Sequence, residues 1–269
     1  MKKLYFKTCL VVFLALGVLS CEQEPDLTGE EIPADVLQNI ERLGFSTDGV
    51  VREKDLGGFI IEGDIHITEA ELNSVPKEIR VPNEEQYHTF NLVTSTPRTI
   101  NILVDRRANS VSAATDAAIS RYNAEPLTLS LQRVSKRKDA DIIITSAPRR
   151  AQYLASAGFP TSEGEPHSSI KVNLSVISGQ PLGTVASIMA HEIGHCIGFR
   201  HTDWFDRSIS CGGSPVNEGQ QNSGVGAVYI PKTPTGATNA AQSFMLSCIG
   251  SGQDRPFNGD DKTALDYLY

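Results

Sequence analysis

Residues 182–201, LGTVASIMAHEIGHCIGFRH, decide the fold of this chain. Residues 182–199 of this segment are predicted to form one long helix, because apolar residues recur at helical spacing along them. Within a helix, His191 and His195 lie one turn apart on the same face, so both imidazoles can bind one metal ion. Glu192 is displaced from that pair by one position. The segment therefore predicts a helix that carries a metal site.

His201 can join this site only if the chain turns. In a continued helix it would lie about 15 Å along the axis from His191, far beyond a zinc–nitrogen bond of about 2.1 Å. Gly198 lacks a Cβ and can adopt a left-handed conformation, which ends the helix and returns His201 to the metal. The five fixed residues of this spacing would recur by chance with a probability on the order of one in a hundred thousand.

Three histidine ligands leave zinc one open position for water, which is the arrangement of catalytic sites. Zinc lowers the pKa of that water to about 7, and Glu192 can accept its proton and pass it to the leaving amine. The residues therefore predict metal-assisted amide hydrolysis. A zinc-containing cell-surface binding module would not need Glu192, and a hydrolase of non-protein amides would look the same; both stay open as alternatives. The remaining histidines lack this spacing and are expected to be ordinary surface or core residues: His66, His88 and His167.

The segments around this helix predict a mixed α/β layer. Apolar and alternating patterns favour four strands and one helix ahead of it, with strands at 99–105, 127–131, 140–146 and 168–175 and the helix at 109–124. The last strand could bind an extended peptide at a sheet edge or lie inside the sheet. Near the end of the chain, Asp260 or Asp261 could cap a final helix within 259–269.

HEIGHCIGFRH, residues 191–201, resembles the zinc signature of the metzincin metallopeptidases, and its HEIGH form resembles the bacterial dual-action HEIGH metallopeptidases. The resemblance covers most of residues 50–269. It implies a zincin-like α/β (α+β) fold with metzincin architecture: a mixed five-stranded sheet, an active-site helix and an irregular C-terminal subdomain ending in a helix. It also implies a zinc endopeptidase of proteins or peptides, with Zn²⁺ held by the three histidines and Glu192 as general base.

The same resemblance implies two further roles. Met245 is the candidate for the Met-turn beneath the metal, with a gap-filling core methionine as the alternative. Ser247 stands where some metzincins carry a zinc-binding tyrosine, so no tyrosine switch is expected there. Residues 60–65, IIEGDI, resemble the Phe-x-Gly-Asp prosegment motif of astacin-type metzincins, with Ile61 in place of phenylalanine. This implies that Asp64 fills the fourth zinc position and keeps the enzyme latent; a turn aspartate is the alternative.

Residues 1–20 are predicted to be a signal peptide. Three lysines precede an apolar run that is too short to span a bilayer. The run ends in VLSC, which resembles a bacterial lipobox and implies lipidation of Cys21 as the first mature residue. A soluble secreted protein is the alternative. We expect a lipoprotein of the outer membrane or cell surface, with the periplasmic face as the other location, attached through its N-terminal lipid.

The negative charge of the chain is confined to one region. Residues 22–95 carry 17 Asp and Glu against 5 Lys and Arg, a net of −12, whereas residues 96–269 carry 15 against 16, a net of +1. No basic patch indicates nucleic-acid binding, and the acidic stretch indicates a solvated surface. We expect an acidic tether and prosegment-like region at 21–95, without a core of its own, a catalytic domain at 96–269, and a monomer.

Beyond the N-terminal two, the cysteines are Cys196, Cys211 and Cys248, in a compartment where disulfides persist. Cys211 with Cys248 is the favoured pair, because it would join the loop after the zinc motif to the segment around Met245. Cys196 with Cys211 is the rival pair. Asp203 lies two residues after the third histidine and could orient the site or occupy an ordinary turn.

Overall fold

The computed structural model describes residues 31–73, 86–218, 226–234, 237 and 242–269. The predicted signal peptide and Cys21 lie outside these residues. Residues Ile32–Tyr269 form one compact unit, so the predicted prosegment-like region and catalytic domain belong to the same unit. Within the described ranges, no helix combines the length and apolar character that a membrane span requires.

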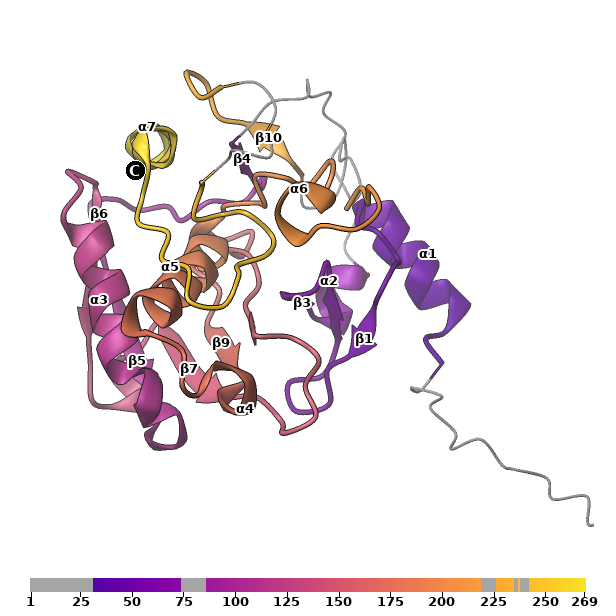
Figure 1. Cartoon of the computed structure of the whole chain (residues 1–269), viewed down its shortest axis with the longest axis horizontal. Helices are drawn as coiled ribbons and strands as arrows, with labels where there is room; N and C mark the ends of the chain where they lie inside the picture. Colours follow the sequence, from indigo (N-terminus) through magenta and orange to yellow (C-terminus); the bar gives the residue numbers. More distant parts are fainter. Residues whose placement is uncertain (1–30, 74–85, 219–225, 235–236, 238–241) are drawn as a thin grey trace, which may run out of the picture. The chain divides into compact units, whose positions relative to one another are not determined.

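Helices and short strands are interspersed along this unit (Figure 1). The first elements are α1 Ala34–Leu43, β1 Val51–Arg52, β2 Phe59–Ile61, β3 Ile65–Ile67, α2 Glu69–Leu72 and β4 Tyr87–His88. The central elements are β5 Arg98–Val104, η1 Arg106–Val111, α3 Ser112–Asn123, β6 Leu129–Arg133, η2 Arg137–Asp139, β7 Ile142–Ser146, β8 Ala155–Ser156, β9 Ser169–Val172 and α4 Leu174–Ile177. The last elements are α5 Leu182–Ile197, α6 Ser208–Cys211, β10 Val228–Tyr229 and α7 Gly259–Leu268.

The main sheet has five strands in the order β6-β5-β7-β9-β8. All neighbours are parallel except β8, which runs antiparallel to β9. The predicted mixed five-stranded sheet is therefore confirmed. The segment 168–175 forms β9 and then α4, and β9 lies between β7 and β8. It is thus an interior strand, and the edge belongs to the two-residue strand β8, which the sequence patterns did not predict.

Helices α3 and α5 lie side by side and pack on the sheet (Figure 1). Fourteen residues of α5 are buried, from Thr184 to Ile197. Its small and apolar residues let it enter the main core, where Tyr122 of α3 donates a hydrogen bond to the carbonyl of Ala190 at 2.8 Å. This burial fixes the helix that carries His191 and His195.

The N-cap of α7 lies before the predicted positions Asp260 and Asp261. Asn258 is the N-cap, and its side chain accepts from the backbone of Asp261, whose own side chain accepts from Asn258 in a capping box. Asp261 also accepts hydrogen bonds from Ser243 and from the Phe244 amide. The predicted N-cap at Asp260 or Asp261 is therefore wrong, although Asp261 takes part in the capping box and also ties α7 to the segment around Met245.

The N-terminal part has a hydrophobic cluster of its own, contrary to expectation. Strands β1, β2 and β3 form an antiparallel sheet beside α1. Their short apolar runs are buried on both faces, so they show no alternating pattern from which a core could be predicted. The cluster consists of Ile40, Leu43, Phe45, Phe59, Ile61, Ile65, Ile67, Leu72 and Phe159. Because Phe159 follows β8, this cluster joins the N-terminal sheet to the edge of the main sheet.

Candidate active site

The three histidines of the signature are held by hydrogen bonds at their Nδ1 atoms. His191 donates to the Phe244 carbonyl at 2.8 Å, and His195 donates to the Phe199 carbonyl at 2.8 Å. His201 donates to the Glu218 carboxylate at 2.8 Å. Because these oxygens only accept, each Nδ1 carries the proton and each Nε2 keeps a free lone pair.

The three Nε2 atoms converge on one point. Their separations are 3.0 Å for His191 and His195, 3.2 Å for His195 and His201, and 3.3 Å for His191 and His201. Ligands about 2.1 Å from a tetrahedral zinc ion are about 3.4 Å apart, so the donor set fits zinc. Three facing lone pairs repel one another unless a cation lies between them. The geometry of these buried nitrogen atoms is therefore explained by a metal ion bound between them and not by hydrogen bonds from one histidine to another.

Gly198 ends α5 and turns the chain toward His201. Its φ is 112°, in the left-handed region, and the amides of Gly198 and Phe199 bond to the carbonyls of His195 and Gly194. This is a Schellman motif. A Cβ on Gly198 would lie 2.7 Å from a methyl group of Leu92, so the turn requires glycine for space as well as for φ.

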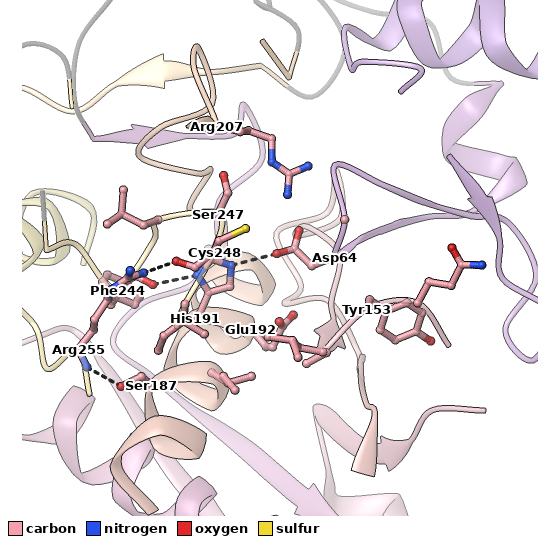
Figure 2. A pocket seen from close by; sticks show the side chains of 17 residues that line it. Asp64, Tyr153, Ser187, His191, Glu192, Arg207, Phe244, Ser247, Cys248 and Arg255 are labelled. Atoms are coloured by element: carbon pink, nitrogen blue, oxygen red, sulfur yellow. Dashed lines mark hydrogen bonds and ion pairs between the residues drawn. The ribbon is translucent and has the colours of Figure 1, made fainter. Parts of the chain in front are cut away.

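Glu192 lies on α5 next to the histidine cluster and points into a cavity that Asp64 and His191 also line (Figure 2). Its side chain is 2% exposed, and its Oε2 has no hydrogen-bond partner among the described residues. Burial raises the pKa of this carboxyl well above its usual range; the charge of Asp64 adds to the shift and His201 opposes it. A buried carboxylate oxygen without a partner can accept a proton from water in the cavity.

The carboxylate of Asp64 completes the donor set. Its Oδ2 is 3.2 Å from His201 Nε2 and 3.3 Å from His191 Nε2, and Figure 2 shows it directed at His191. These four ligand atoms form a group that could hold one metal ion. Burial alone would raise the pKa of Asp64, but the three histidines outweigh it and hold the pKa well below the usual range. A bound cation would favour the same ionised state.

Asp64 is also a turn residue, and its role as a zinc ligand stays a prediction. It ends the turn between β2 and β3, in which Glu62 and Gly63 have φ values of 51° and 92°. The Glu62 carboxylate forms an ion pair with Arg200 at 2.9 Å, with both side chains fully buried. Since Arg200 precedes His201, this pair fixes the turn against the metal site.

Met245 lies under the HEIGH segment. It is fully buried, and a Cβ built on Gly194 would lie 2.6 Å from its sulfur. The Thr202 amide donates to the Met245 carbonyl at 2.9 Å, which ties the chain after His201 to this turn. Gly194 is therefore the residue whose small size lets methionine approach α5.

Glu218 is a site residue that the sequence interpretation did not include. It is 1% exposed, it accepts the His201 bond described above, and it forms an ion pair with Arg207 Nε at 2.9 Å. No local spacing marks it, because it lies in a loop seventeen residues beyond His201. Only the tertiary fold brings it to the imidazole.

Asp203 and the disulfide join the loops around the site. Asp203 is fully buried and accepts from the Ser247 amide and hydroxyl at 2.8 Å and from Ser210 at 2.5 Å. It therefore orients the chain after His201 against the segment of Met245. Cys211 and Cys248 form a disulfide with a Cα separation of 5.1 Å, and Cys196 is a buried free thiol.

The other histidines lie away from this cluster. His66 is 4% exposed and bonds to the Gly57 carbonyl at 2.6 Å, and its ring lies 6.0 Å from that of His167. Burial lowers the pKa of His167 to about 4, with a smaller contribution from His66. His88 bonds to the Thr89 carbonyl at 2.6 Å. Among the described residues, the two groups that could hold a metal ion contain none of these three.

Three buried imidazoles with converging lone pairs, beside an unpaired carboxylate, define the site of a metal-dependent hydrolase. The model of the dual-action HEIGH metallo-peptidases matches residues 59–269, so the chain belongs to that family. The family predicted from the zinc signature is thereby confirmed.

Two solved structures are similar to the chain at low identity. Myroilysin is 13% identical over 66% of this chain and 96% of its own, with a TM-score of 0.42. High choriolytic enzyme 1, a hatching-enzyme zinc protease from Oryzias latipes (medaka fish), is 13% identical over 59% of this chain and 90% of its own, with a TM-score of 0.30. No curated protein sequence matches the chain.

Proposed function

We propose that the protein is a zinc-dependent endopeptidase of the metzincin type that hydrolyses peptide bonds in protein or peptide substrates. One arrangement supports this above all: the converging Nε2 atoms of His191, His195 and His201 next to the unpaired Oε2 of Glu192. Imidazole ligands at tetrahedral spacing suit zinc better than the oxygen-preferring ions calcium and magnesium.

In this proposal each residue has one task. A zinc ion, when bound, supplies Lewis-acid chemistry that polarises the peptide carbonyl and acidifies water. Glu192 takes the proton from the attacking water and delivers it to the leaving amine. Met245 and the buried face of α5 hold the imidazoles in place from below. No covalent bond between enzyme and substrate is needed.

We further propose that the chain is made in a latent form, because the β2–β3 turn occupies the site. Asp64 Oδ2, which lies 3.2 Å from His201 Nε2 and 3.3 Å from His191 Nε2, would be the fourth ligand. The same segment pairs in parallel with the edge of the main sheet: the His66 amide donates to the Ala157 carbonyl at 2.6 Å, and the Ala157 amide donates to the Asp64 carbonyl at 3.0 Å. An extended substrate would need that edge, since edge strands bind peptides by adding a strand.

The endopeptidase proposal is tested by zinc content and by digestion of casein, using the full chain carrying Asp64→Ala. We expect one zinc ion per chain. Adding Glu192→Ala should abolish casein digestion while the zinc content stays the same. Adding His195→Ala should abolish digestion and also remove the zinc. Glu163→Ala, at an exposed position, is the control that should change neither. Digestion that survives Glu192→Ala contradicts the proposal. Bound zinc without digestion of any peptide supports a zinc-containing binding module instead.

Latency is tested by comparing the unprocessed wild-type chain with Asp64→Ala. Loss of the carboxylate should raise casein digestion by the full chain at least 10-fold, because the fourth position opens to water and substrate. Asp48→Ala, at an exposed position of the same N-terminal part, is the control. Equal digestion by wild type and Asp64→Ala, at equal zinc content, would show that Asp64 is only a turn residue.

We also propose, from the sequence alone, that Cys21 is lipidated and anchors a monomeric protein to the outer membrane or cell surface. Incorporation of labelled palmitate that disappears in Cys21→Ala supports this proposal. Antibody labelling of intact cells then separates the outer surface from the periplasmic face.

A further inference from the structure

A cavity of about 240 Å³ extends from the metal site along α5. Its lining includes Asp64, His191 and Glu192, and Arg255 lies on the opposite side of His191 from Asp64 (Figure 2). The lining also includes the apolar residues Ile188, Phe244, Leu246 and Ile249. A side chain of a substrate bound at the metal site could therefore enter a cavity that apolar residues and an arginine line.

Arg255 carries a buried charge without a carboxylate partner. It is 8% exposed, and its guanidinium donates to the Cys248 carbonyl at 2.6 Å and to Gln253 at 3.2 Å. None of the carboxylates in the described ranges forms an ion pair with it. Burial lowers its pKa, and the charges of Asp203 and Asp261 oppose this only in part. A buried cation of this kind is stabilised by an anionic ligand.

The carboxylates near Arg255 form ion pairs or hydrogen bonds with other residues. Asp254 forms an ion pair with Arg121 at 2.6 Å. Asp203 accepts from Ser210 and Ser247, as described above. The other arginine of the cavity, Arg207, is paired with Glu218. Arg255 is therefore the cation of this cavity that is left for a ligand, and arginine binds carboxylates through two parallel hydrogen bonds.

We propose that Arg255 makes this cavity a recognition site for an acidic side chain, aspartate or glutamate, at a residue adjoining the scissile bond. This inference rests on the proposed peptidase function and names its substrate class. The apolar walls would contact the methylene groups of the side chain, and the guanidinium would bind its carboxylate. Arg255 would thus determine specificity without taking part in the chemical step.

The first test uses the full chain carrying Asp64→Ala and peptides that differ only at the two residues flanking the scissile bond. Peptides with Asp or Glu at one of these positions should be cleaved about 10- to 100-fold more efficiently, by kcat/KM, than those with Asn or Gln. Arg255→Gln should bring the two sets within about threefold, and Arg255→Lys should restore part of the preference. Arg133→Gln is the matched control, because Arg133 pairs with the carboxylate of Asp116 and does not line the cavity.

A second measurement does not depend on turnover. Two small hydroxamates, one bearing a carboxylate side chain and the other the matching carboxamide, are titrated by calorimetry into the zinc-loaded full chain carrying Asp64→Ala. The carboxylate should bind at least 10-fold more tightly to the chain with Arg255, and equally to Arg255→Gln. Equal affinity for the intact site overturns the acidic preference while leaving the peptidase proposal standing. A chain that binds neither zinc nor hydroxamate overturns both.

Discussion

Glu218 determines how His201 is presented to the metal. Its carboxylate fixes the imidazole through Nδ1 and makes the ring a stronger ligand than a carbonyl partner would. The other two signature histidines donate to backbone carbonyls. The one histidine ligand outside α5 therefore has a charged partner, which compensates for its position in a loop.

Replacing Glu218 by glutamine should weaken zinc binding by about 10- to 100-fold. The shape of the side chain is kept, but the negative charge that supports His201 is lost. Competition with a fluorescent zinc chelator measures the affinity. Glu165→Gln, at an exposed carboxylate that pairs with Arg98, should leave it unchanged. Unchanged affinity in Glu218→Gln would mean that the carboxylate is only a packing partner.

Replacing Gly194 by alanine should destabilise the folded protein by about 1–3 kcal/mol. The added methyl group would meet the Met245 sulfur at 2.6 Å and the Phe244 ring at 3.0 Å, so the segment beneath α5 must shift. Urea unfolding of the zinc-loaded chain measures the loss. Gly259→Ala is the matched control, since a Cβ at that position has nothing within 4 Å. A change as small as the control's would contradict this role of Gly194.

The site residues that could be predicted from the sequence are those whose positions follow from local backbone geometry. His191 and His195 could be recognised as a ligand pair from their helical spacing. Gly198 could be recognised as the turn residue, because the chain must reverse there to bring His201 to the metal. Glu218 could not be identified, because its contact with His201 depends on a loop path that no spacing encodes. The buried charge of Arg255 was missed for the same reason.

Among the elements, the β2–β3 hairpin depends on one buried ion pair. Glu62 and Arg200 are 2.9 Å apart with no exposed side-chain surface, and the Arg200 guanidinium lies 4.8 Å from the centre of the Phe45 ring. Breaking a buried pair by removing one charge leaves the other charge uncompensated. The hairpin that carries Asp64 is therefore held by a contact that a single substitution can disrupt.

Glu62→Gln should lower the free energy of unfolding by about 3 kcal/mol and raise casein digestion by the full chain although Asp64 is retained. Both effects follow from weaker docking of the hairpin. Urea unfolding and the casein assay measure them. Glu41→Gln, on the exposed side of α1, is the control. A loss of stability without any gain in digestion would separate the ion pair from latency.

The prediction of elements succeeded where segments were long. The helix at 182–197 and the four predicted strands all exist, since their apolar runs are long enough to reveal a period. Strand β8 has two residues, and β2 and β3 have three each, all buried. Runs this short carry no readable alternation, so both the sheet edge and the N-terminal core became visible only in the folded chain.

For the whole molecule, removal of zinc should lower stability. The ion binds only the folded arrangement of the three histidines, so at a thousandfold excess over its Kd it stabilises that state by about 4 kcal/mol. Thermal unfolding with and without EDTA measures the difference. His195→Ala should abolish the sensitivity to chelation. Equal melting temperatures for the wild-type chain in both conditions would contradict a metal-stabilised fold.

We expect the contact between Ala157 and the hairpin to affect solubility as well. Within the described residues, Ala157, which directly follows β8, pairs with residues 64–66. If the hairpin dissociated, the chain would expose free amide and carbonyl groups at this sheet edge. Exposed sheet edges can pair with any extended polypeptide, including a second copy of the same protein. Activation and the tendency to self-associate would then arise from one event, so the processed protein is expected to aggregate at high concentration unless a bound peptide occupies the strand.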